Sequence, residues 1–131
     1  MLVALGYGDR LRVLSGSELS AELQRLAGQL PVPMVQMQTA MALSQTRVPA
    51  DTQRAIQLLQ RLLGQDSPEA RTLHPLARLL AAQLSEQRRL EEQSDRQVQQ
   101  LRDALRRIDQ LTDRLDALRA IERSLPSRPS R

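Results

Sequence analysis

The stretch from Leu76 to Leu125 contains neither glycine nor proline. Ala, Leu, Arg, Gln and Glu dominate it, and all of these residue types favour the α-helix. At about 1.5 Å per residue, an unbroken helix of this length extends ~75 Å. The remaining residues can form only a small helical head, which is too small to cover a helix of that length. The sequence therefore predicts one long helix, most of which projects from the rest of the protein.

The amino-acid composition favours helices throughout the chain. Tyr7 is the single aromatic residue, since the sequence contains no Phe and no Trp. A core must then be built from Leu, Ala, Val, Ile and Met, which suit helix-on-helix packing better than a sheet. We expect an all-α fold with a small helical head of about four short helices, followed by a long C-terminal coiled-coil helix. The expected division is residues 1–74 for the head, 75–125 for the long helix and 126–131 for a disordered tail.

Capping and breaking residues divide the head into its helices. Ser15 and Glu18 fit a capping box, in which each side chain bonds the other residue's backbone N–H. The prolines of segment 31–33 end one helix, and the segment 47–51 forms the next turn. Segment 66–69, Asp-Ser-Pro-Glu, is typical of a helix start and predicts the beginning of the long helix.

Pro75 lies about two turns inside the long helix, where proline removes a hydrogen-bond donor. We expect it to kink the helix or to split off a short helix that ends at His74. His74 is the only histidine and the chain has no Cys, so neither a metal-ligand set nor a catalytic triad can be assembled. No phosphate-binding loop is present either. We therefore expect a non-enzymatic protein with no catalytic residues, no cofactor and no metal.

The long helix carries a regular apolar pattern in its C-terminal half. Apolar residues recur there in steps of three and four, with a mean spacing of about 3.4 residues, close to a heptad repeat with one or two register slips. We call the following eight residues the apolar stripe and predict that they bind a partner: Val98, Leu101, Leu105, Ile108, Leu111, Leu115, Leu118 and Ile121. A lone helix cannot bury them. A second copy of the chain, a helix of another protein, or the head folding back could cover the stripe.

Charged residues support this picture of a solvated helix. The formal net charge is +4, and every basic residue is Arg. Asp and Glu alternate with Arg along the long helix, for example Asp103 with Arg107, which favours pairs within the helix over a basic groove for nucleic acid. The polar interval from Gln87 to Gln97 is expected to be a solvated neck. No signal peptide, lipobox or membrane-spanning segment is apparent.

The C-terminal sequence resembles the end of QseG-type lipoproteins. That family finishes a coiled coil with an Ile-Glu-Arg-x-Leu motif, which matches segment 121–125, and then a short Ser/Arg/Pro tail. The block from Pro75 to Leu80 and the Glu86-Gln87-Arg88 region resemble the family's entry into the coil. The head, with Asp9-Arg10-Leu11 and segment 43–47, is more loosely similar.

The resemblance implies an outer-membrane lipoprotein that faces the periplasm. Such a protein binds the periplasmic sensor domain of a histidine kinase, QseE, which is paired with the response regulator QseF, and it promotes their two-component signalling. The sequence has neither the family's signal peptide nor its lipidated Cys. A lipid anchor and the periplasmic location are therefore implied by the family alone, and the sequence is interpreted as a soluble portion or one that begins late.

Two further functions stay open from the sequence. A homodimeric coiled coil would use the same stripe for self-association, as in a structural scaffold. Binding of nucleic acid would need arginines segregated on one face, which the interleaved acids disfavour.

Overall fold

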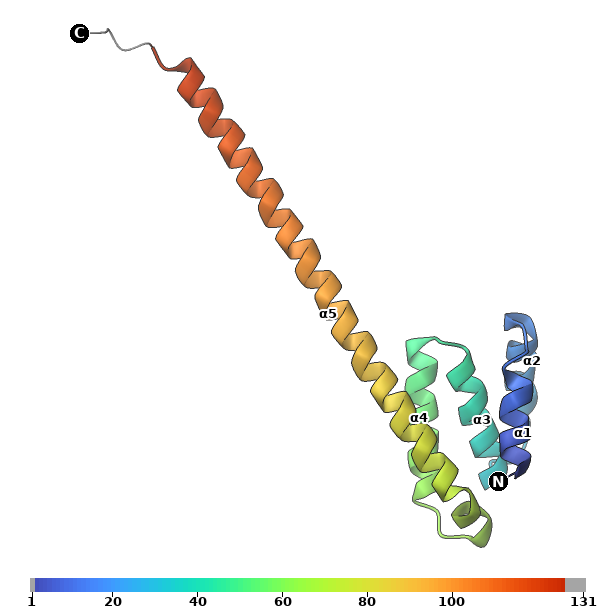
Figure 1. Ribbon diagram of the computed structural model, residues 1–131. Coiled ribbons are helices and arrows are strands. Elements are labelled where there is room, and N and C mark those ends of the chain that lie inside the picture. Colours follow the sequence, from blue (N-terminus) through green and yellow to red (C-terminus); the bar gives the residue numbers. More distant parts are fainter. Residues whose placement is uncertain (1, 127–131) are drawn as a thin grey trace. The chain divides into compact units, whose positions relative to one another are not determined.

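The structure is a computed structural model that describes residues 2–126 of the chain, and this part is built of helices joined by short loops, without a strand. The elements are α1 (Leu2–Leu11), α2 (Gly16–Ala27), α3 (Pro33–Gln45), α4 (Pro49–Leu63) and α5 (Pro68–Ser124) (Figure 1). The all-α class, the four short helices and the long last helix are thus confirmed. Pro126 has no regular secondary structure, and the rest of the expected tail lies outside the described residues.

Side-chain hydrogen bonds cap the starts of α2 and α5. At α2, the Glu18 N–H donates to Ser15 Oγ over 3.3 Å, and the Ser15 N–H donates to Glu18 Oε1 over 3.3 Å, which confirms the capping box. At α5, Ser67 Oγ accepts from the Ala70 N–H at 3.2 Å. Proline is the first residue of α3, α4 and α5, where its missing N–H would have no partner within the helix.

The turn between α3 and α4 contains the one residue within 2–126 that has a positive φ. Arg47 has a φ of 58°, which places it in the left-handed region. Thr46 Oγ1 donates to Asp51 Oδ2 over 2.8 Å and so ties the end of α3 to the first turn of α4. This short connection makes α3 and α4 a helical hairpin.

α3 is the central helix of the head, because it packs against α1, α2 and α4 (Figure 1). One cluster of buried side chains joins α1, α3, α4 and the first part of α5, with Met37, Leu43, Leu59 and Leu73 at most 2% exposed. A second cluster joins α1, α2 and α3. Its buried members are Tyr7, Leu11, Leu19, Leu26 and Ala42. The core is therefore aliphatic apart from Tyr7, as the composition requires.

α5 is one unbroken helix, and Pro75 lies inside it. The expected separate short helix ending at His74 is therefore not formed. The lost backbone donor at Pro75 removes a single hydrogen bond, whereas Leu73 and Ala77 on either side are buried in the core. Burial of these side chains holds the helix together across the proline.

Two compact units divide the chain, and the first extends to Leu90. It contains α1 to α4 and the beginning of α5, so the expected boundary between residues 74 and 75 lies within α5. The last buried side chain in the described part of the chain is that of Leu84. The second unit begins at Glu91 and consists of the C-terminal part of α5.

Candidate functional site

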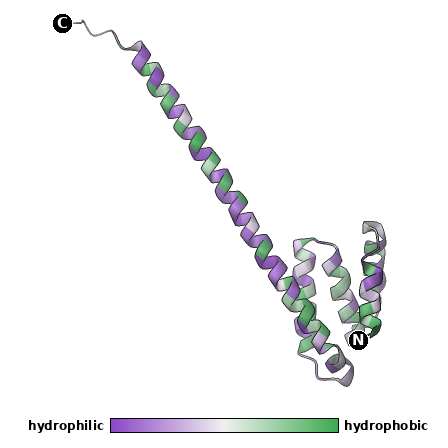
Figure 2. Ribbon diagram, viewed as in Figure 1, coloured by the Kyte–Doolittle hydropathy of each residue, from purple (hydrophilic) through white to green (hydrophobic). Residues whose placement is uncertain are grey.

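The candidate site is the apolar stripe on the second unit. All eight stripe residues lie on the C-terminal part of α5, and their side chains are between 45% and 62% exposed. In Figure 2, short hydrophobic segments recur along this part of the helix among strongly hydrophilic ones. Every residue from Glu92 to Pro126 is exposed. The structure therefore leaves the whole predicted stripe accessible.

Exposure of such a stripe is unusual for a helix of a soluble protein. A Leu or Ile side chain contributes roughly 1.5–3 kcal/mol when it is fully buried, and none of the eight gains this within the chain. Scattered exposed leucines are common, but a row repeated every three or four residues is typical of a surface that packs against another helix. The stripe has the chemistry of a partner-binding surface.

The polar face of the second unit carries a charged pair at Asp103, with Arg106 in place of the expected Arg107. Arg106 pairs with Asp103 at 3.3 Å between Nη2 and Oδ1, and Gln99 Nε2 donates to the same carboxylate oxygen over 3.1 Å. The expected partner of Asp103, Arg107, is one residue further along. Both spacings bring side chains together on a helix, so periodicity alone does not choose between them.

No known family, curated protein or solved structure matches this chain. The surface must therefore be interpreted from its own chemistry. Within residues 2–126, no helix is both long enough and apolar enough to cross a membrane.

A second accessible surface lies in the first unit. A hollow of about 720 Å³ lies among α1, the C-terminal half of α3 and residues 76–87 of α5. Leucine side chains form much of its lining, together with the charged residues Asp9, Arg12 and Arg47. The leucines are Leu5, Leu11, Leu76, Leu79, Leu80 and Leu84. The first unit thus has a concave surface of its own, separate from the apolar stripe.

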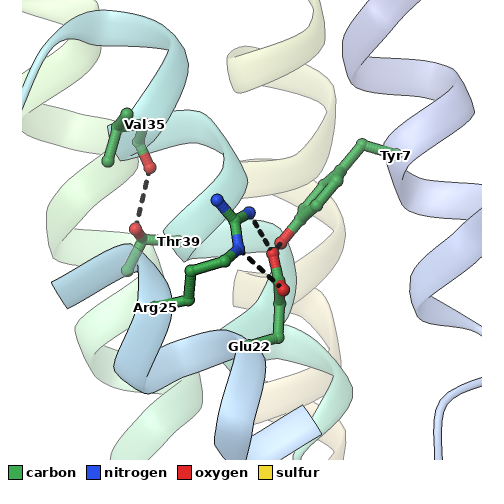
Figure 3. Close-up of polar contacts among 5 residues, drawn as sticks. All are labelled: Tyr7, Glu22, Arg25, Val35 and Thr39. Carbon is green, nitrogen blue, oxygen red and sulfur yellow. Dashed lines mark hydrogen bonds and ion pairs between the residues drawn. The ribbon is translucent and has the colours of Figure 1, made fainter. Parts of the chain in front are cut away.

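A polar cluster links α1 to α2 in the head. The Tyr7 hydroxyl donates to Glu22 Oε1 over 2.6 Å, and Arg25 donates from Nε to Glu22 Oε2 over 3.0 Å (Figure 3). A second Arg25 nitrogen bonds Glu22 Oε1. Figure 3 also shows the Thr39 hydroxyl, which donates to the Val35 carbonyl within α3 over 2.8 Å.

These contacts change the acidity of both titratable groups. The Arg25 and Tyr7 hydrogen bonds stabilise the Glu22 carboxylate and lower its pKa to about 2. Burial, followed by the hydrogen bond to Glu22, raises the pKa of the Tyr7 phenol well above its ordinary value. The cluster joins two helices, and none of its three residues lines the hollow in the first unit, so we interpret its role as structural.

The only histidine also makes a structural contact. His74 is half-buried, and its Nε2 lies 3.1 Å from the Leu62 carbonyl oxygen near the end of α4. Because a carbonyl oxygen can only accept, this nitrogen carries the proton in the hydrogen bond. Helix C-termini leave carbonyl groups without intrahelical partners, and the Leu62 carbonyl accepts from both His74 and the Gln65 N–H.

Sequence reasoning located the stripe but missed both the hollow and the Tyr7–Glu22 contact. The stripe follows from periodicity within one helix. The hollow and the contact each need the packing of separate helices, about which the spacing of residues in one helix gives no information.

Proposed function

We propose that this chain is a non-enzymatic accessory protein that binds helices of another protein through the apolar stripe. On the resemblance of the Ile121-Glu122-Arg123 ending, the partner is the periplasmic sensor domain of a QseE-like histidine kinase, and the effect is on two-component signalling. The same resemblance supports a lipid-anchored form at the periplasmic face of the outer membrane. The single observation that carries partner binding is the exposure of all eight stripe residues.

The physical basis is burial of apolar surface on one helix by another. Apolar residues spaced three and four positions apart suit knobs-into-holes contacts with another helix better than contacts with a sheet or a flat surface. A helical ligand that packs against helices of the kinase would act directly on their arrangement.

Modulation would occur as a shift between conformations of the kinase. A bound helix changes the balance between two arrangements only to the extent that it binds one of them better. The accessory protein therefore needs no chemistry of its own.

The test is the mass in solution by light scattering over a wide concentration range, with and without the periplasmic domain of a QseE-like kinase. A monomer or weak dimer that forms a defined complex supports the proposal. A stable homodimer that does not bind the kinase domain would instead support the scaffold function.

Paired variants locate the contact. Replacement of Leu105 and Ile108 by Asn should abolish the complex, because it places polar groups at the centre of the stripe. Replacement of Ala117 and Ala120 by Asn makes two polar changes on the exposed opposite side and should leave the complex intact. Circular dichroism should show the same helix content for both proteins. Binding that survives the Leu105/Ile108 change would exclude the stripe as the contact.

A further inference from the structure

The part of α5 that lies in the second unit fits an unbroken heptad repeat. Leu101, Ile108 and Leu115 are separated by seven residues, as are Ala104, Leu111 and Leu118. With the first set at positions a and the second at positions d, no register slip is needed between residues 101 and 118. We call these six residues the seam. The remaining stripe residues then lie beside the seam at the flanking positions e and g.

Charged residues are sorted by sign with respect to the seam. Between residues 98 and 121, the charged residues at the flanking positions are Arg107 and Arg114 at g and Arg119 at e. The acids of the same interval occupy positions b, c and f, away from the seam. These acids are Asp103, Asp109, Asp113 and Asp116. The seam is therefore bordered by positive charge alone.

This border makes self-pairing unfavourable. In a parallel pair, position g of one helix faces the following e of the other, which brings Arg114 opposite Arg119. In the antiparallel pair that aligns the seams, position g faces g, which brings Arg107 opposite Arg114. Each such contact occurs twice by symmetry. Like charges across a helix pair are repulsive, so both arrangements of two copies are penalised.

We propose that the seam binds a helix of a different protein whose flanking positions carry Asp or Glu. Such a partner buries the same apolar residues and replaces each Arg–Arg contact with an Arg–carboxylate pair, which Arg can make in a bidentate geometry. This inference rests on the proposed function in that it requires a helical partner, and it specifies the chemistry by which that partner is selected over a second copy.

The probes are two synthetic helical peptides with identical Leu and Ile seams, one with Glu and one with Lys at every e and g position. Binding of each peptide to the full chain is measured by titration calorimetry at low and at high salt. We expect the Glu peptide to bind at least about tenfold more tightly than the Lys peptide at low salt, and the difference to shrink at high salt because these flanks are exposed. Equal binding of the two peptides, or preference for the Lys peptide, would overturn the inference.

A charge-reversed pair of variants provides the matched control. Arg107→Glu with Arg114→Glu changes the flanks, whereas Arg102→Glu with Arg106→Glu makes the same change in net charge at positions b and f. The first variant should reverse the preference between the peptides, and the second should keep it. Loss of preference in both variants would mean that net charge, and not the flanks, selects the partner, which contradicts the inference.

The two proposals fail in different ways. If neither peptide binds and the kinase domain does not bind either, the stripe is not a helix-binding surface and the proposed function is wrong. If both peptides bind equally well, helix binding stands and only the selection by charge is wrong.

Discussion

Glu22 accepts every polar contact of the cluster that joins α1 to α2. Its carboxylate receives hydrogen bonds from the Tyr7 hydroxyl and from the Arg25 guanidinium, and the Tyr7 ring is buried at 5% exposure. A hydrogen bond from a buried donor to a charged group contributes more than a neutral one, on the order of 1.5–3 kcal/mol, and Tyr7 is such a donor. The cluster therefore fixes the first helix of the head by means of one carboxylate.

The stability of the head should depend on pH at both extremes. The pKa of Glu22 is lowered from 4.5 to about 2, so the ionised carboxylate stabilises the folded state above about pH 4.5, and this stabilisation is lost as the pH falls towards 2. The pKa of Tyr7 is raised from 10.0, so its contribution is present below pH 10 and is lost as the pH rises beyond it. Urea unfolding at a series of pH values, followed by circular dichroism, measures both losses.

The variant Glu22→Gln distinguishes the contribution of this carboxylate to the acid loss of stability from the contributions of the other carboxylates. It should lower the free energy of unfolding at pH 7 by about 1–3 kcal/mol and should remove part of the decline below pH 4.5. Asp9→Asn, at a carboxylate whose side chain is 75% exposed, should do neither. An unchanged acid decline in Glu22→Gln would show that other carboxylates are responsible for it.

At the scale of the helix, the same residue type has opposite roles in the two units. Leu59 in α4 is fully buried, whereas Leu111 in α5 is 60% exposed. Leu59→Ala should lower the free energy of unfolding by about 2–5 kcal/mol, because it leaves a cavity in the core. Leu111→Ala should change the unfolding of the head by less than about 0.5 kcal/mol and should weaken partner binding instead. Thermal unfolding and titration with the partner distinguish the two effects, and a large loss of head stability in Leu111→Ala would contradict the assignment.

The helices themselves were predictable because their signals are local. The capping box of Ser15 and Glu18, the proline at the start of α4 and the stripe on α5 all involve residues within a few positions of one another. At Pro75, the expected separate short helix was wrong for the opposite reason. Its local cost was apparent from the sequence, but the burial of Leu73 and Ala77 that outweighs it depends on helices elsewhere in the chain.

The candidate binding surface was predictable to the same extent. The positions of the stripe follow from periodicity, and their exposure confirms only that they are accessible. The hollow in the head and the Tyr7–Glu22 contact were not predictable, since Glu22 is fifteen residues from Tyr7 and its partner could have been any nearby donor. Contacts between helices need the packed structure.

For the whole molecule, the division into two units separates the buried core from the proposed binding surface. All buried residues of the described chain lie at or before Leu84, and the first unit ends at Leu90. A chain that stops after Leu90 should therefore keep the thermal midpoint of the head within a few degrees, since no buried side chain is removed. It should lose partner binding completely. Calorimetry and light scattering measure these outcomes, and a midpoint lower by more than about 10 °C would show that the second unit contributes to the stability of the head.

The single aromatic residue has a practical consequence for studying this protein. Tyr7 is the only intrinsic fluorophore, and it lies in the first unit with its hydroxyl bonded to a carboxylate, an arrangement that quenches phenol emission. Emission should therefore increase when α1 separates from α2 and should not respond to events in the second unit. The protein thus carries a built-in optical probe of its head, and a single tryptophan introduced on α5 after Glu91 would report on the second unit at a separate wavelength.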